Sequence, residues 1–216
     1  VGPGLNSRDY EQSAPLLVNA GADVLCIGCG LGMGPHSEKL LKKVLENNKT
    51  PAVIDADGLN LLAKTDEWGI EQIRMNPSGY VLTPHMKEMS RLTGYSVQEL
   101  KDNRRELLRK YTEKVHAVCV LKDSRTLVKA PEGRLIINTT GNAAMAKAGS
   151  GDVLAGMITG FMAQHMRPDD AAVLSVYLHG LCGDHARKEL GSYSVLAGDL
   201  LKMLGRTLKE LEDMTE

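Results

Sequence analysis

Two glycines and one aspartate gather where an apolar helix is about to begin. The stretch Gly149-Ser150-Gly151-Asp152 is followed at once by the apolar run VLAGMITGF. Free backbone amides and the positive dipole end at a helix start attract anions, and glycine lets a phosphate approach the backbone closely. A carboxylate beside such a phosphate can accept the proton of an attacking hydroxyl. The pattern favours nucleotide-dependent phosphoryl transfer, with Asp152 as the base.

A helix cap is the competing interpretation of Asp152, because aspartate commonly occupies that position. The lead-in from Gly141 to Ala148 is nearly all small residues, which a plain cap does not need, and its Lys147 can also reach a phosphate. The chain has no GxxxxGK[ST] sequence, and the loop GCGLG at 28–32 lacks the GxGxxG spacing of a dinucleotide fingerprint. This loop is better interpreted as a glycine-rich strand end that touches a ligand.

The elements that must position these groups alternate between strand and helix. Short apolar runs predict buried parallel strands, the segment TLVKAPEGRLIIN predicts a hairpin, and helical spacing predicts the helices between and after them. The strands are expected in ADVLCIGCG, PAVIDADG, GYVLTPH and HAVCVLK, and the helices at 36–48, 86–94, 97–115, 151–165, 168–190 and 194–213. This order predicts an α/β fold with a mostly parallel central sheet and helices on both faces.

Polar residues cluster at the carboxyl ends of these strands, where ligands bind in such sheets. The clusters are Gly28–Gly34, Asp55 with Asp57, Thr83–His85 and Lys122–Thr126. Their convergence at one edge predicts a single site.

The overall composition and charge argue against two classes of binding partner. The 216 residues are 43% hydrophobic and 25% charged, with a net charge of −1, which argues against nucleic acid and against a membrane surface. No apolar run approaches the ~18 residues that a membrane span needs. The four cysteines predict a reducing, cytoplasmic setting, and Cys26 and Cys29 are expected to pack inside a buried strand rather than to serve metal or redox chemistry. We expect one domain over residues 1–216.

Several motifs occur in an order that resembles a known family. They are ADVLCIGCGLG, VIDADGLNLLA, YVLTPHMKEMSRLTG, VLKDSRTLV and GRLIINTTGNAAMAKAGSGDVLAGMI, and the closing helices add to the match over about residues 22 to 208. The chain is similar to the ADP/ATP-dependent NAD(P)H-hydrate dehydratases of the ribokinase-like superfamily. The resemblance implies a three-layer sandwich, and relative to the family we expect this chain to lack the N-terminal strands.

The resemblance also implies a reaction. In NADHX and NADPHX, water has been added across a double bond of the nicotinamide ring. The family phosphorylates the new hydroxyl from ADP or ATP, with Mg²⁺, and loss of phosphate restores NADH or NADPH. A homo-oligomer is expected. Two alternatives stay open at this point: another ribokinase-like kinase acting on a vitamin-precursor alcohol, and a non-catalytic nucleotide-binding fragment.

Site residues carry over position by position onto this sequence. The resemblance implies that Asp152 is catalytic and that the hydrate is contacted by Gly30, Gly32, Asp55, Asn60, His85 and Asp152. It implies nucleotide contacts by Lys122, Asp123, Ser124, Arg125, Thr126, Asn142, Ser150 and Gly151, and no metal held by protein ligands. His85 and Asp57 can alternatively act as helix caps, and His179 and His185 are interpreted as packing residues.

Three positions depart from the family's usual pattern. Cys29 stands where the glycine loop usually has proline, and Asp123 stands where the lysine segment usually has glycine. The stretch NAAMAKAGSGD replaces the usual NPGMATGGTGD, which places alanines at glycine and proline positions and introduces Lys147.

Overall fold

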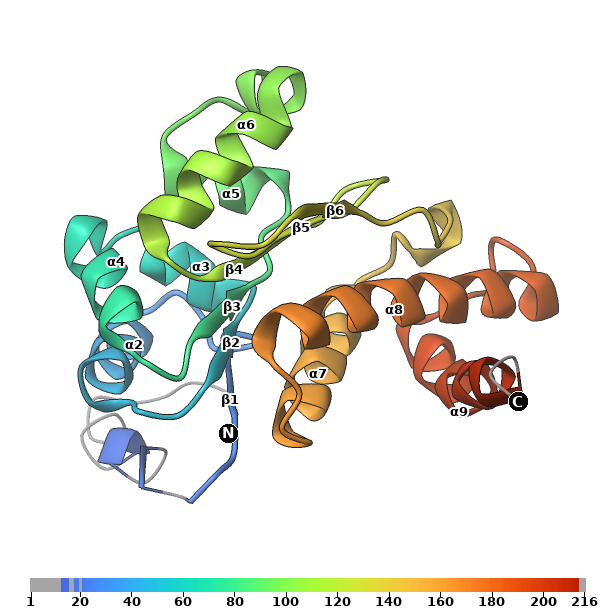
Figure 1. Ribbon diagram of the computed structural model, residues 1–216, viewed down its shortest axis with the longest axis horizontal. Helices are drawn as coiled ribbons and strands as arrows, with labels where there is room; N and C mark the ends of the chain where they lie inside the picture. The colour runs from blue at the N-terminus through green and yellow to red at the C-terminus, as the bar shows by residue number, and fades with distance from the viewer. Residues whose placement is uncertain (1–12, 16–17, 20, 214–216) are drawn as a thin grey trace.

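The computed structural model describes residues 13–15, 18–19 and 21–213, and its centre is a six-stranded sheet (Figure 1). The strands lie side by side in chain order as β1 (Leu25–Ile27), β2 (Ala52–Ile54), β3 (Tyr80–Leu82), β4 (Val118–Leu121), β5 (Leu127–Lys129) and β6 (Leu135–Ile137). Strands β1 to β4 run parallel to one another. Strand β5 runs antiparallel to β4, and β6 runs antiparallel to β5. The predicted parallel sheet and the predicted hairpin are both confirmed.

Helices cover both faces of the sheet, which confirms the three-layer arrangement (Figure 1). One layer holds α2 (Pro35–Asn47), α3 (Asp57–Leu62), α4 (Asp66–Met75), α5 (Met86–Thr93) and α6 (Val97–Val115). The other holds α7 (Ser150–Ala163) and α8 (Pro168–Leu190), with α9 (Ala197–Asp213) packed against both, and a short 3₁₀ helix, η1 (Ala143–Met145), precedes α7.

The period-two alternation of each strand divides its side chains between the two layers. Val53 and Val81 pack with α7 and α8, whereas their neighbours Ile54 and Leu82 pack with the first helical layer. All four side chains are fully buried. The continuous apolar runs in the sequence therefore reflect burial on both faces, as is usual for parallel strands.

Several helices begin or end at the residues that their predicted capping signals indicate. The Ser96 hydroxyl accepts the Glu99 amide at 3.2 Å, and the Glu99 carboxylate accepts the Ser96 amide at 2.8 Å, which is the predicted capping box of α6. Gly94 ends α5 in the left-handed conformation. Helix α4 is absent from the prediction, because only Gly69, Ile70 and Ile73 of its ten residues are buried. None of the helices in the described ranges is both long enough and apolar enough to cross a membrane.

The expectation that the first strand is fully buried is wrong. Strand β1 has only three residues, and both Cys26 and Cys29 are exposed. The reason is position: β1 lies at the edge of the sheet formed by the described residues, so β2 covers only one of its sides.

Gly28, in the turn that follows β1, has no room for a side chain. Its φ is +123°, and a Cβ there would lie 1.9 Å from the Asp55 carbonyl oxygen and 2.6 Å from the Gly58 nitrogen. Gly28→Ala should therefore lower the free energy of unfolding by more than about 3 kcal/mol, since backbone must move to relieve the clash. Chemical denaturation measures this loss. Gly21→Ala is the control, because Gly21 has a φ of +67° in open space and should lose only about 1–2 kcal/mol. Equal losses would refute the packing argument.

Candidate active site

An ion pair joins two strand ends at the centre of the site. Asp55 follows β2 and Lys122 follows β4, and the Lys122 Nζ lies 2.6 Å from Asp55 Oδ1. The Asp55 side chain is 1% exposed and that of Lys122 is 20% exposed. A buried carboxylate needs such a partner, so the two residues hold the carboxyl edge of the sheet together.

The start of α7 presents free amides beside this pair. Gly149 precedes the helix with a φ of +87°, and no side chain caps the helix. Within the described chain, the amides of Gly151 and Asp152 donate no hydrogen bond, whereas the Ser150 amide donates to the Lys147 carbonyl at 3.2 Å. The cap interpretation of Asp152 is therefore wrong. Two of the three expected amides remain available for an anion.

Gly151 allows the helix to approach the ion pair. A Cβ at this position would lie 3.3 Å from the Lys122 Nζ and 3.6 Å from Asp55 Oδ2. The lysine ammonium and the free amides of α7 thus face the same small volume. A positive side chain and a helix N-terminus aimed at one point form a site for a phosphoryl group.

His179 is a site residue that the sequence analysis assigned to packing. Its Nε2 lies 3.3 Å from the Ser150 hydroxyl, and its ring lines the cavity described below. Burial lowers the pKa of His179 to about 4, with the nearby Lys122 acting in the same direction. The imidazole is therefore neutral near pH 7 and can orient the Ser150 hydroxyl without adding charge.

This neutral histidine should make the protein sensitive to acid. Between the unfolded pKa of 6.5 and the folded pKa of about 4, the unfolded chain binds the extra proton. Stability therefore falls as the pH falls through this window, by at most about 1.4 kcal/mol per pH unit from this group. Urea unfolding of the wild type and of His179→Gln across this range measures the effect. A variant with the same acid dependence as the wild type would refute the assignment.

A cavity of about 780 Å³ extends from the start of α7 toward the hairpin. It brings together most of the predicted nucleotide residues, together with the predicted substrate residue His85. The predicted residues that line it are His85, Lys122, Asp123, Ser124, Thr126, Asn142, Ser150 and Gly151. Gly30, Gly32, Asp55, Asn60, Arg125 and Asp152 lie outside this lining, and their assigned contacts stay predictions.

His85 serves α5 as a cap and also faces the cavity. Its Nδ1 accepts the backbone amides of Lys87 and Glu88, each at 3.1 Å. The Glu88 carboxylate in turn accepts a hydrogen bond from the His85 backbone amide at 2.8 Å. Burial raises the pKa of the Glu88 carboxyl. These bonds fix the ring in place and confirm the cap interpretation of His85, whereas its contact with substrate stays a prediction.

The unusual Asp123 is neutralised from a neighbouring helix. Arg104 of α6 lies 3.1 Å from its carboxylate, which also accepts the Ser124 amide. This pairing reduces the repulsion that a free carboxylate would exert on a phosphate. Arg125 donates to the Thr139 carbonyl at 2.8 Å and so ties the lysine segment to the chain just after β6.

Asp184 of α8 is a second residue that the sequence analysis missed. Its carboxylate accepts the Gly141 amide at 3.0 Å and the Asn142 amide group at 2.8 Å. The Asn142 side-chain oxygen in turn accepts the Ala144 amide. The side chain of Asn142 is thus engaged in shaping the loop, and the altered stretch at 143–148 is held by α8. In the sequence, only the pair Gly141-Asn142 at the start of the loop indicates that the loop needs a hydrogen-bonding partner such as Asp184.

The glycine loop after β1 is tied to α3. The Gly32 amide donates to Asp57 at 2.8 Å, so Asp57 holds the loop instead of capping α3. Asn60 accepts a bond from Arg91 of α5 at 2.7 Å. The DADxLN segment therefore anchors one wall of the site.

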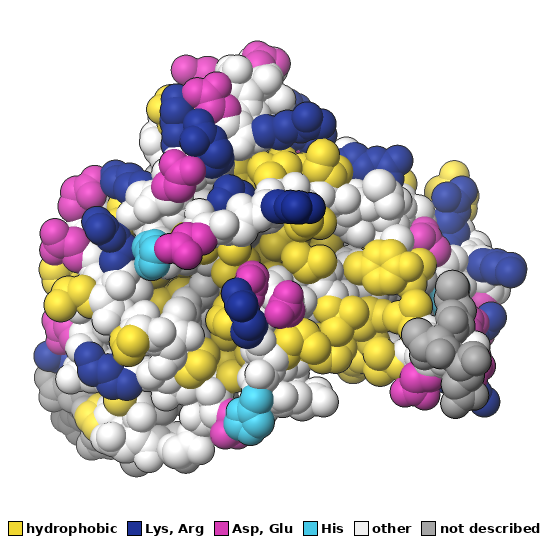
Figure 2. Space-filling model, viewed as in Figure 1, with side chains coloured by type: hydrophobic (Ala, Val, Ile, Leu, Met, Phe, Trp, Pro, Cys, Tyr) yellow, Lys and Arg dark blue, Asp and Glu magenta, His cyan; other side chains and the backbone are white. Residues whose placement is uncertain are grey.

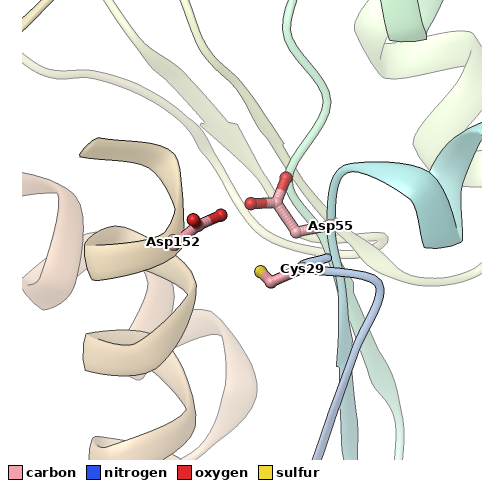
Figure 3. Close-up of side chains that lie close together, drawn as sticks. All are labelled: Cys29, Asp55 and Asp152. Carbon is pink, nitrogen blue, oxygen red and sulfur yellow. The ribbon is translucent and has the colours of Figure 1, made fainter. Parts of the chain in front are cut away.

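Asp152 points across the site toward the two strand-end loops. Figure 3 shows the Asp152 carboxylate, the Asp55 carboxylate and the Cys29 sulfur facing one another. One ligand atom from each lies within 4.8 Å of the others. Contact with the Cys29 thiol lowers the pKa of the adjacent Cys26 to about 7.

An apolar groove of about 590 Å³ borders Asp152. It runs between α7 and α9, and Val153, Met157, Phe161 and Leu204 are among its lining residues. Figure 2 shows hydrophobic side chains gathered over the region of α7 and α8. Asp152 therefore borders this apolar surface and also faces Asp55 and Cys29.

Comparison with known proteins gives one consistent result. The family model described as NAD(P)H-hydrate dehydratase matches residues 3–206. The chain is 44% identical over 214 residues to the bifunctional NAD(P)H-hydrate repair enzyme Nnr of Moorella thermoacetica, covering 99% of this chain but 39% of that protein. It therefore spans less than half of that bifunctional relative.

A shorter relative and a crystal structure point to the same family. The ADP-dependent (S)-NAD(P)H-hydrate dehydratase of Bacillus subtilis is 39% identical over 203 residues, covering 94% of this chain and 70% of that protein. The crystal structure of the ADP/ATP-dependent NAD(P)H-hydrate dehydratase from Bacillus subtilis, co-crystallised with ATP/Mg²⁺, has a TM-score of 0.79, 31% identity, and coverage of 94% and 69% of the two chains. The ribokinase-like fold expected from the sequence is confirmed, and the chain belongs to the NAD(P)H-hydrate dehydratase family.

Proposed function

We propose that this chain catalyses the nucleotide-dependent dehydration of NADHX and NADPHX, with ADP or ATP as the phosphoryl donor. The observation that carries the proposal is the position of the Asp152 carboxylate, in the first turn of α7 beside two free amides and across from Lys122. Membership of the dehydratase family supplies the substrate class.

The first step is a phosphoryl transfer. Asp152 takes the proton from the hydroxyl of the hydrate, and that oxygen attacks the terminal phosphorus of the nucleotide. The bond from phosphorus to the bridging oxygen breaks, and the shortened nucleotide leaves. The amides of Gly151 and Asp152, with Lys122, stabilise the charge on the transferred group.

The second step restores the ring. The carbon–oxygen bond to the new phosphate breaks, the neighbouring ring carbon loses a proton, and the double bond of NADH or NADPH forms. Burial of Asp55 against Lys122 fixes the lysine, and His179 fixes the Ser150 hydroxyl, so both phosphate-facing groups are oriented before substrate arrives.

Magnesium fits this site as a partner of the nucleotide. Among the described residues that line the large cavity, Asp123 supplies the carboxylate, and it is already paired with Arg104. Mg²⁺ keeps several waters and is usually held by substrate phosphates with one or two carboxylates. The ion would be held mainly by phosphate oxygens, and when bound it neutralises phosphate charge.

The test is recovery of reduced cofactor from the hydrate. Purified protein incubated with NADHX and either nucleotide should regain the absorbance of NADH, and omission of nucleotide should abolish the gain. No recovery above the protein-free background would overturn the proposal. A vitamin-precursor alcohol that consumes nucleotide faster than NADHX does would favour the alternative kinase.

We also propose a reducing, cytoplasmic setting and association of copies into a homo-oligomer. The four cysteines are free thiols, which fits a reducing compartment. The apolar groove between α7 and α9 is the surface most suited to a further contact. Light scattering coupled to size-exclusion chromatography measures the oligomeric state.

A further inference from the structure

The cluster of Cys29, Asp55 and Asp152 joins three elements at one point. Cys29 lies in the loop after β1, Asp55 in the loop after β2, and Asp152 in the first turn of α7. Their ligand atoms lie within 4.8 Å of one another, and the side chains converge in Figure 3.

We propose that these three side chains form a binding site for a thiophilic divalent cation of the Zn²⁺ class, and that the bound cation inhibits the enzyme. The inhibition rests on the function proposed above, whereas the binding does not. Phosphoryl transfer itself makes no use of a thiol at this point.

The donor set selects the type of cation. One sulfur and two carboxylate oxygens suit zinc, which accepts both ligand types, whereas magnesium avoids thiolates. Ligand atoms around one tetrahedral zinc lie roughly 3–4 Å apart. The three atoms lie within 4.8 Å of one another, so side-chain rotations that shorten these distances would complete the site. The exposure of Cys29 and Asp152 leaves a path for the ion and a fourth position for water.

Asp55 offers an oxygen that the described protein does not use. Its Oδ1 is bonded to Lys122, but Oδ2 accepts no hydrogen bond from any described residue and faces Gly151 near the cluster. The whole Asp55 side chain is 1% exposed, and among the described residues its charge is paired with that of Lys122. A buried carboxylate oxygen of this kind is stabilised by a cation.

The charge balance also favours a divalent ion. The two carboxylates of Asp55 and Asp152 face one cationic side chain, that of Lys122. When the ion binds, the Cys29 thiol releases its proton to solvent and the sulfur–metal bond forms. The added thiolate and the divalent cation then bring the formal charge of the group to zero. Asp152, held as a ligand, can no longer accept a proton from substrate.

The binding test uses the full chain with Zn²⁺ and Co²⁺ alone, without nucleotide or hydrate. A phosphine reductant keeps the adjacent thiols reduced, and a chromophoric chelator competes for Zn²⁺. We expect one equivalent to bind, and Cys29→Ser to weaken affinity by at least about tenfold. The Co²⁺ complex should show a thiolate charge-transfer band that the variant lacks. Asp152→Asn provides a second variant, since that exposed residue can be replaced without disturbing the core.

Cys182→Ala is the control, because Cys182 is a buried thiol between α8 and α9, outside the cluster. It should bind Zn²⁺ like the wild type. Absence of a wild-type Zn²⁺ site would overturn the proposal, as would equal losses in Cys182→Ala and Cys29→Ser. If the protein proves active, Zn²⁺ should inhibit it reversibly by chelator and inhibit Cys29→Ser less. Failure of activity alone would leave the binding result standing.

Discussion

Replacing Asp152 with asparagine should lower kcat for NADHX dehydration by about 100- to 10,000-fold, the usual contribution of a general base. The amide has nearly the shape of the carboxylate but cannot accept the hydroxyl proton. Because Asp152 is exposed and caps no helix, the fold should survive the change. Steady-state recovery of NADH measures the loss, and the thermal shift on adding ADP measures whether the nucleotide still binds.

A matched control comes from α9. Asp199 lies in the first turn of that helix, as Asp152 does in α7, but it pairs with Lys202 and the Leu196 amide. Asp199→Asn should keep wild-type turnover. If Asp152→Asn stays within about tenfold of wild type, another group accepts the proton and the assigned base is wrong.

Replacing Lys122 with methionine should give the largest loss of stability. The change leaves the Asp55 carboxylate, 1% exposed, without its cation. Removal of one partner from a buried ion pair typically costs about 3–5 kcal/mol, because the remaining charge stays desolvated. Urea unfolding at neutral pH measures the loss, and nucleotide protection should disappear with it, since Lys122 faces the phosphate site.

The double variant separates the ion pair from other roles of the lysine. Asp55→Asn removes the stranded charge, so Lys122→Met with Asp55→Asn should be more stable than Lys122→Met alone. The two effects should couple by more than about 1 kcal/mol, as expected for residues in direct contact. Additive effects would mean that Asp55 and Lys122 do not stabilise each other in solution.

The fold follows from the sequence because its signals are local and redundant. Continuous apolar runs predicted β2, β3 and β4 as strands that are buried on both faces of the sheet. The Ser96 capping box predicted the start of α6. Helix α4 was missed because it buries few residues. The burial of Cys26 was misjudged because an apolar run alone does not tell an edge strand from a central one.

The site could be predicted only in part, because its key contacts join distant segments. The helix-start pattern around Asp152 predicted free amides at the start of α7, and the described structure leaves those of Gly151 and Asp152 without an acceptor. No local pattern pairs Lys122 with Asp55, which are 67 positions apart, or His179 with Ser150. These contacts depend on which strand ends meet and on how α8 packs over α7. The same holds for Cys29, whose neighbours come from two other elements.

The most direct test of the central claim is the stoichiometry of one reaction. NADH formed and inorganic phosphate released from ADP or ATP are measured together, with NADHX as the substrate. Phosphorylation followed by elimination predicts one phosphate for each NADH, and neither product without nucleotide. NADH formed without phosphate, or phosphate released at the same rate without NADHX, would contradict it.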